Sequence, residues 1–151
     1  LMKAVIQRVT EASVSVDGET VGEIESGLCV FLGVAAEDTD EDLRLLLRKI
    51  PNFRIFKDED GKMNRSVLDT RGSILVISQF TLFGSWRKGN RPGFTDAAPP
   101  EKGEEYYNRF VDEIKKQGIP TETGTFGAMM KVDLVNDGPV TFMMDTRENR
   151  T

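Results

Sequence analysis

Residues 27–34 read GLCVFLGV, an unbroken apolar run that predicts a buried strand at the centre of a sheet. A helix is predicted shortly after this run, over residues 38–50, because apolar side chains recur there at the spacing of one helix face. That apolar stripe consists of Leu43, Leu46, Leu47 and Ile50. Acidic residues at the start of the helix and basic residues in its last turn suit the helix dipole, and Pro51 is expected to end it.

Strands are predicted for most of the remaining chain. Strands over 3–10 and 12–16 precede an Asp17-Gly18 turn, after which a third strand runs on to Ile24. Further strands are expected at 53–56, 73–80, 130–135 and 140–145. A second helix is expected from Pro99 and Pro100 to about Gln117. The pattern predicts one α+β domain over residues 1–151, a three-layer α/β arrangement of two packed β-sheets with the two main helices on one face.

The amino-acid composition excludes several kinds of chemistry. Histidine is absent, which removes Ser-His-Asp and Cys-His catalysis as these are normally built. The single cysteine, Cys29, has no histidine to activate it and is expected to be a core residue rather than a nucleophile. The usual zinc ligands are missing, and the acidic turn at 58–61 is expected to be solvated rather than to bind calcium. We therefore predict no metal and no cofactor.

The formal net charge of −5 argues against a broad basic face for duplex binding, so no DNA partner is expected. A nucleic acid would have to be gripped locally, with few phosphate contacts. No apolar run approaches the roughly 18 residues that span a bilayer, so no membrane partner is expected. Without a signal-peptide pattern at its start, the chain is expected in the cytoplasm.

Three segments are polar or conformationally unusual where a plain core would not be. Ser78-Gln79-Phe80-Thr81 ends a strongly apolar strand, although these hydroxyls could also bond only the local backbone. Residues 87–92, RKGNRP, hold three cations, which suit either a phosphate or carboxylate ligand or a solvated basic loop. Residues 136–141, NDGPVT, contain a Gly-Pro bond that permits a cis peptide, although they could form a simple turn.

Together these segments resemble the D-aminoacyl-tRNA deacylase family, also known as the D-tyrosyl-tRNA deacylases. The strand end at 78–81 resembles the family's SQ-containing motif, and residues 136–141 resemble its NxGPxT motif. Other stretches resemble the family in the right order: Arg8-Val9, Ala12-Ser13-Val14, Asn90-Arg91-Pro92, residues 96–100 and residues 124–130. The resemblance implies two packed sheets with helices on one face, and a homodimer with two active sites at its interface.

The resemblance also implies roles for individual residues. Ser78, Gln79, Phe80 and Thr81 would line the pocket around the scissile ester, with the Phe80 amide as an oxyanion donor. Phe126, Gly127 and Met130 would hold the terminal adenine of the tRNA. Gly138 and Pro139, joined by a cis bond, would reach into the partner's site and reject L-amino acids. Glycine has no side chain to collide there, so glycine mischarged on alanine tRNA would also be cleaved.

Two mechanisms remain open for the ester hydrolysis. Without a histidine, we favour assistance by the 2′-hydroxyl of the terminal adenosine, while the protein positions the ester. The alternative uses Thr81 as the nucleophile, although no base to activate its hydroxyl is evident. A non-catalytic module that binds RNA ends is a further alternative. Arg87, Lys88 and Arg91 are the candidates for contacting tRNA phosphates.

Overall fold

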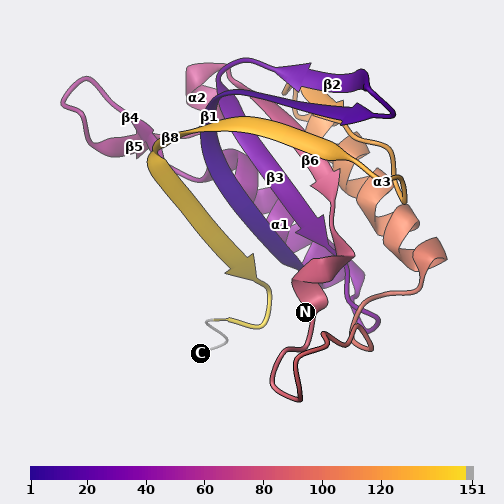
Figure 1. Cartoon of the computed structure of the whole chain (residues 1–151). Helices are drawn as coiled ribbons and strands as arrows, with labels where there is room; N and C mark the ends of the chain where they lie inside the picture. The colour runs from indigo at the N-terminus through magenta and orange to yellow at the C-terminus, as the bar shows by residue number, and fades with distance from the viewer. Residues whose placement is uncertain (149–151) are drawn as a thin grey trace.

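A computed structural model of the chain describes residues 1–148 and shows the curved sheet of Figure 1 with helices behind it. The first elements are β1 (Lys3–Val16), β2 (Glu19–Ile24), β3 (Gly27–Gly33), α1 (Asp40–Asn52), β4 (Phe56–Lys57) and β5 (Met63–Arg65). There follow α2 (Val67–Thr70), β6 (Ser73–Ser78), the 3-10 helix η1 (Phe80–Phe83), α3 (Pro100–Lys116), β7 (Thr121–Thr123) and β8 (Lys131–Asp145). The α+β class predicted from the sequence is confirmed.

The main sheet has six strands in the order β2-β1-β3-β6-β7, with β8 along the other edge of β1. Strand β1 is antiparallel to β2, β3 and β8, whereas β3, β6 and β7 run parallel to one another. The run at residues 27–34 therefore lies inside the sheet, as predicted. The carboxyl ends of these parallel strands lie together at one end of the sheet. Open sheets commonly bind ligands at this end.

The two packed layers belong to one folded-over sheet rather than to two separate sheets. Strand β1 is continuous over the predicted break between residues 10 and 12, and β8 pairs with it along most of its length. The far half of β1, with β2 and the start of β8, crosses over the β3–β6 strands (Figure 1). Between the layers lies an apolar core that includes Val14, Ile24, Cys29, Leu75 and Ile77.

Helices α1 and α3 cover the other face of the sheet, as predicted. Their apolar stripes pack on the opposite side chains of β3 and β6 in one core. Members of this core include Leu43, Leu46, Ile50, Tyr107, Phe110, Ile114, Val30, Ile74 and Val76. Alternate residues of β3 and β6 thus face two different cores, which explains why both strands are apolar without interruption.

Several predicted boundaries were wrong. Pro51 lies inside α1 instead of ending it. Since proline lacks an N–H, the Leu47 carbonyl loses its helical partner, but the Gln117 side chain donates to it at 3.2 Å. The strand expected at 53–56 is Phe56–Lys57, and the strand expected at 73–80 ends at Ser78. The short elements α2 and β7 were not predicted.

The segments expected as two closing strands, 130–135 and 140–145, form the single bent strand β8. Residues 136–139 are therefore not a hairpin turn, because both halves of β8 pair with the same strand, β1. The ladder shifts register opposite this segment, between Gln7 and Glu11 of β1. Such a local irregularity lets residues bulge out of a strand without reversing it. No helix described within residues 1–148 is long and apolar enough to cross a membrane.

Candidate active site

A cavity of about 540 Å³ opens at the carboxyl ends of the parallel strands β3, β6 and β7. Leu32 and Val34 line it from the end of β3, and residues 78–81 line it from the end of β6. Its remaining walls come from residues 94–103 and from the loop 126–130 that follows β7. The structure thus brings together two of the predicted groups of site residues, 78–81 and 126–130.

The polar edge of this cavity is formed by the turn from β6 into η1. The Gln79 amide N–H donates to the Leu32 carbonyl at 2.8 Å, which fixes the turn to β3. The Gln79 side chain donates to the Thr81 hydroxyl at 2.9 Å. Phe80 begins η1, and the first N–H groups of a helix have no acceptor inside that helix. The turn therefore offers backbone donors, an amide and hydroxyls at the cavity mouth.

The apolar end of the cavity is formed by Phe126 and its neighbours. The Phe126 ring is half-buried and lies 6.0 Å from the Tyr107 ring, centroid to centroid. Tyr107 is fixed in turn, because its hydroxyl donates to the Val76 carbonyl at 2.8 Å. Gly127 has a positive φ of 77°, a backbone conformation that glycine adopts easily. Met130 is half-buried beside them, so this end suits a flat apolar ring such as a nucleobase.

The cavity has an unusual electrostatic character. Among the described residues, its lining contains no aspartate, glutamate, lysine, arginine or cysteine side chain. The nearby Tyr107 hydroxyl stays protonated at neutral pH, since burial raises its pKa to about 12, and its proton is already donated to the Val76 carbonyl. Burial likewise raises the pKa of the Cys29 thiol to about 12, in the core between the layers, as predicted for a core cysteine. This cavity can position a reactant, but its own side chains offer no general acid or base.

Gly138 and Pro139 lie elsewhere, on the exposed bend of β8. The bond between them is cis. Neither residue lines the cavity described above, nor does any other residue of 136–141 in the described part of the chain. Within one chain, therefore, the structure does not bring the predicted chirality element together with the predicted ester pocket.

Arg8 is a functional candidate to which sequence reasoning gave no role. Its side chain is 3% exposed, and it donates to the Ile55 carbonyl at 2.7 Å and to the Asp137 carbonyl at 3.2 Å. It also forms an ion pair of 3.3 Å with the Asp137 carboxylate. Asn136 closes the same bend by donating to the carbonyls of Arg8 and Val140, both at 2.9 Å. The buried Arg8 side chain on β1 thus anchors the exposed segment around Gly138 through Asp137.

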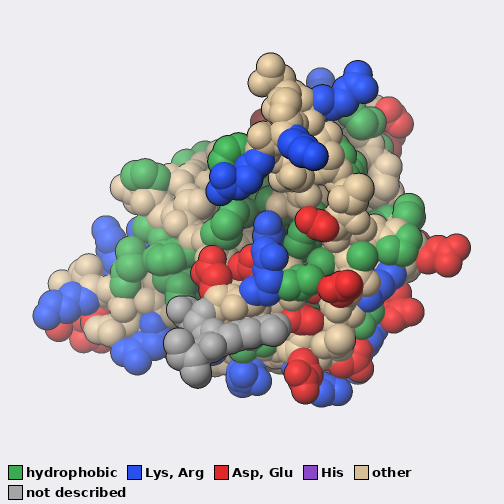
Figure 2. Space-filling view, turned by 90° about the horizontal axis from the view of Figure 1, so that it is seen from below, with side chains coloured by type: hydrophobic (Ala, Val, Ile, Leu, Met, Phe, Trp, Pro, Cys, Tyr) green, Lys and Arg blue, Asp and Glu red, His purple; other side chains and the backbone are tan. Residues whose placement is uncertain are grey.

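The predicted phosphate-binding residues Arg87, Lys88 and Arg91 are all exposed. They belong to the loop 84–93, which projects from the molecule and carries a group of Lys and Arg side chains at the top of Figure 2. None of the three lines the cavity at 78–81. The loop nevertheless follows η1 directly in the chain. Its first residue is tied to η1, since the Gly84 amide donates to the Thr81 carbonyl at 2.9 Å.

The fold is that of the D-aminoacyl-tRNA deacylase class, as similar proteins indicate. A chain from Thermotoga petrophila named D-aminoacyl-tRNA deacylase is 56% identical over 96% of this chain and 97% of its own length. One of the same name from Bacillus mycoides is 55% identical over 97% of this chain and 100% of its own.

Two solved structures share the fold of this chain. A c-Myc DNA unwinding element binding protein superposes with a TM-score of 0.90 at 47% identity, over 95% of this chain and 97% of that one. A probable eukaryotic D-amino acid tRNA deacylase shares the fold with a TM-score of 0.84 at 18% identity, over 95% and 98% of the two chains. The protein belongs to the D-Tyr-tRNA(Tyr) deacylase family, whose model matches residues 5–145.

Proposed function

We propose that the protein hydrolyses the ester between a D-amino acid and the terminal ribose of tRNA, releasing the free amino acid and the tRNA. Membership of the family supports this reaction. The observation that carries it is the cavity at 78–81, which is polar at its mouth but has no ionisable side chain in its described lining. Such a cavity suits a substrate that brings its own reactive neighbour, as an aminoacyl ester does with the adjacent 2′-hydroxyl of its ribose.

The residues of the cavity divide the work between binding and positioning. Phe126, Gly127 and Met130 hold the terminal adenine by stacking and apolar contact. Ser78, Gln79, Phe80 and Thr81 surround the ester, and the Phe80 amide donates to its carbonyl oxygen. The 2′-hydroxyl orients or activates the attacking water. Positioning of this kind is worth roughly 7–11 kcal/mol in favourable cases.

Thr81 as a nucleophile is the rival mechanism. Its hydroxyl accepts a hydrogen bond from the Gln79 amide, and an amide cannot take up a proton as a base would. The lining of the cavity offers no other base among the described residues. Both observations favour the mechanism assisted by the substrate.

Discrimination between the two enantiomers is assigned to Gly138 and Pro139 of a second copy of the chain. They lie outside the cavity of their own chain, exposed on a bend that Arg8 anchors. In a homodimer they reach the partner's cavity, where main-chain atoms form a wall against an L side chain. A wall of this kind contacts no D side chain, so many D-amino acids are accepted. Glycine also passes, so glycine mischarged on alanine tRNA is cleaved too.

The acceptor stem is held through the phosphates by Arg87, Lys88 and Arg91. The name of one similar structure refers to DNA, but we propose RNA for this chain. Its net charge of −5 disfavours a long duplex footprint, and three cations on one loop suit a short contact with an RNA end.

Paired deacylation assays test the proposed reaction. The purified protein is incubated with the same tRNA carrying a D-amino acid, its L counterpart or glycine, and the loss of ester is followed. We expect rapid cleavage of the D and glycyl esters and little cleavage of the L ester. If all three esters stay intact, the proposed hydrolase is refuted and the alternative of a binding module for RNA ends is left standing.

A further inference from the structure

Trp86 is the only tryptophan of the chain, and it is 73% exposed. Single exposed apolar residues are common on protein surfaces, but tryptophan is enriched at binding interfaces. Trp86 follows η1, whose first two residues, Phe80 and Thr81, line the ester cavity. Trp86 itself does not line that cavity. Neither the core nor the proposed chemistry explains an aromatic ring here.

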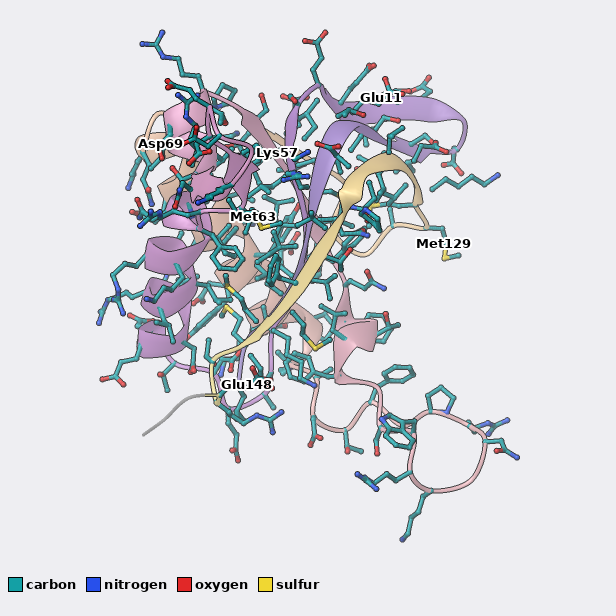
Figure 3. All side chains as sticks on the ribbon, turned by 90° about the vertical axis from the view of Figure 1, so that its left-hand side faces the viewer. Glu11, Lys57, Met63, Asp69, Met129 and Glu148 are labelled. Carbon is teal, nitrogen blue, oxygen red and sulfur yellow. The ribbon has the colours of Figure 1, made fainter. Side chains whose placement is uncertain are left out.

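The backbone around Trp86 is held firmly at the base of the loop. The Ser85 amide donates to the Gly93 carbonyl at 2.7 Å, and the Gly93 amide donates back at 3.0 Å. Just after this pair, the Phe94 ring packs edge-on against Phe80 of the ester cavity, with 5.1 Å between centroids. These contacts tie the base of the loop that carries Trp86 to Phe94 and Phe80, which both line the ester cavity. In Figure 3 the loop extends at the lower right, on the same side of the molecule as the labelled Met129.

The surroundings of Trp86 suit a nucleotide. The Arg87 guanidinium lies over its ring, 5.0 Å from the centroid, and Lys88 and Arg91 are on the same loop. Residues 84–93 contain no acidic residue, although the whole chain is acidic. A stacking ring among cations is the arrangement by which proteins hold single-stranded nucleic acid.

A second cavity of about 390 Å³ is lined by residues 83–87, which follow the ester pocket segment in the chain, and by the cations Lys3 and Arg147. Trp86, Arg87 and Phe83 line it, together with the carboxylates of Glu37 and Asp96. Carboxylates of this kind accept hydrogen bonds from the exocyclic amine of cytosine. This second cavity thus combines an aromatic face, cations and acceptors for an amine.

We propose that Trp86 is the stacking platform for the unpaired cytidines that precede the terminal adenosine of the tRNA. The inference rests on the proposed function, because that function brings the 3′ end of the RNA into the adjoining cavity. A cytidine base lies on the Trp86 ring, and Arg87 holds a neighbouring phosphate. The stack fixes the direction in which the RNA end enters the ester cavity.

The fluorescence of Trp86 reports on this contact directly, because no other tryptophan contributes to the signal. The intact protein is titrated with an uncharged acceptor-stem hairpin that ends in CCA, and with the same hairpin whose two cytidines are abasic. We expect quenching by the first RNA and little by the second, with roughly 5- to 100-fold weaker binding of the second. RNA binding that leaves the tryptophan signal unchanged would overturn the proposal.

Variants separate stacking from charge. Trp86→Ala should raise the KM for D-aminoacyl-tRNA roughly 5- to 100-fold, whereas Trp86→Phe should retain most of the affinity. Trp86→Ala should leave the salt dependence of binding unchanged, while Arg87→Gln should lower its slope by about one. Val21→Ala, which trims another exposed apolar residue, on the distant strand β2, is the matched control. A KM for Trp86→Ala equal to that of the control would refute the platform.

The outcomes also distinguish this inference from the proposed function. If the protein cleaves D-aminoacyl-tRNA but its tryptophan fluorescence does not respond to the RNA, the stacking proposal is refuted and the proposed function stands. A tryptophan that responds to the cytidines in a protein that cleaves no ester would support the platform and refute the hydrolase.

Discussion

At the scale of single residues, the candidate site depends on what is missing from the cavity. The hydroxyls of Ser78 and Thr81 are polar but not activated, because the described lining contains no base. Sequence reasoning reached the same view from the absence of histidine. It named Arg8 only within a family-like stretch and gave it no role, because that role depends on carbonyls of residues 55 and 137, far away in the chain. One signal was available: Ala4, Ile6 and Arg8 alternate on the buried face of β1, where an arginine needs partners.

Replacement of Thr81 tests the mechanism at this scale. We expect Thr81→Ala to retain most of the wild-type kcat, because the hydroxyl only accepts a bond from Gln79. A tRNA whose terminal adenosine is 2′-deoxy should be inert with the wild-type enzyme. Single-turnover rates on D-aminoacyl-tRNA measure both effects. An inactive Thr81→Ala variant together with normal turnover of the deoxy substrate would instead favour Thr81 as the nucleophile.

At the scale of elements, the sequence predicted what local periodicity encodes. The stripes of α1 and α3 and the apolar runs of β3 and β6 were all recognisable, because each reflects burial on a core. The continuity of β1 and β8 was not recognisable, because it depends on their pairing with each other over most of their length. A polar or glycine-containing stretch reads as a turn locally, yet long-range pairing can hold it within a strand. The short strand β7 likewise exists only through its pairing with β6.

The link between β1 and the bend of β8 gives a test of its own. Arg8→Met removes two hydrogen bonds and leaves the buried Ile55 carbonyl without its donor. We expect a loss of about 1–3 kcal/mol in the free energy of unfolding, measured with urea. We also expect a smaller ratio of D to L cleavage, because the bend loses its anchor. The control Arg44→Met breaks only an exposed 3.7 Å pair with Asp40, so it should cost at most about 1 kcal/mol and leave the ratio unchanged.

At the scale of the whole molecule, one chain holds both parts of the proposed site but keeps them apart. The ester cavity lies at the carboxyl ends of the parallel strands, and the Gly138 segment projects from the bend of β8. A homodimer in which each bend enters the other chain's cavity reconciles the two positions. A dimer with twofold symmetry would form two such sites at once.

Two variants that disable different parts of the site are needed to test this arrangement. In Gly138→Ala, the added Cβ would lie 2.7 Å from the Val140 side chain at a φ of +129°, so the bend must shift. We propose that backbone carbonyls of this bend also hold the amino group of the bound D-amino acid, so a shift of about 1 Å there misplaces the ester and can lower the rate by roughly 100-fold. Ala97→Trp fills the ester cavity, which Ala97 lines, and leaves the bend intact.

The most direct measurement mixes these two inactive variants, exchanges their subunits and follows D-aminoacyl-tRNA cleavage. With random pairing, half of the dimers are mixed, and each mixed dimer joins one open cavity to one intact bend, so activity should return to about a quarter of the wild-type value. A mixture that exchanges subunits but stays inactive would contradict the shared site.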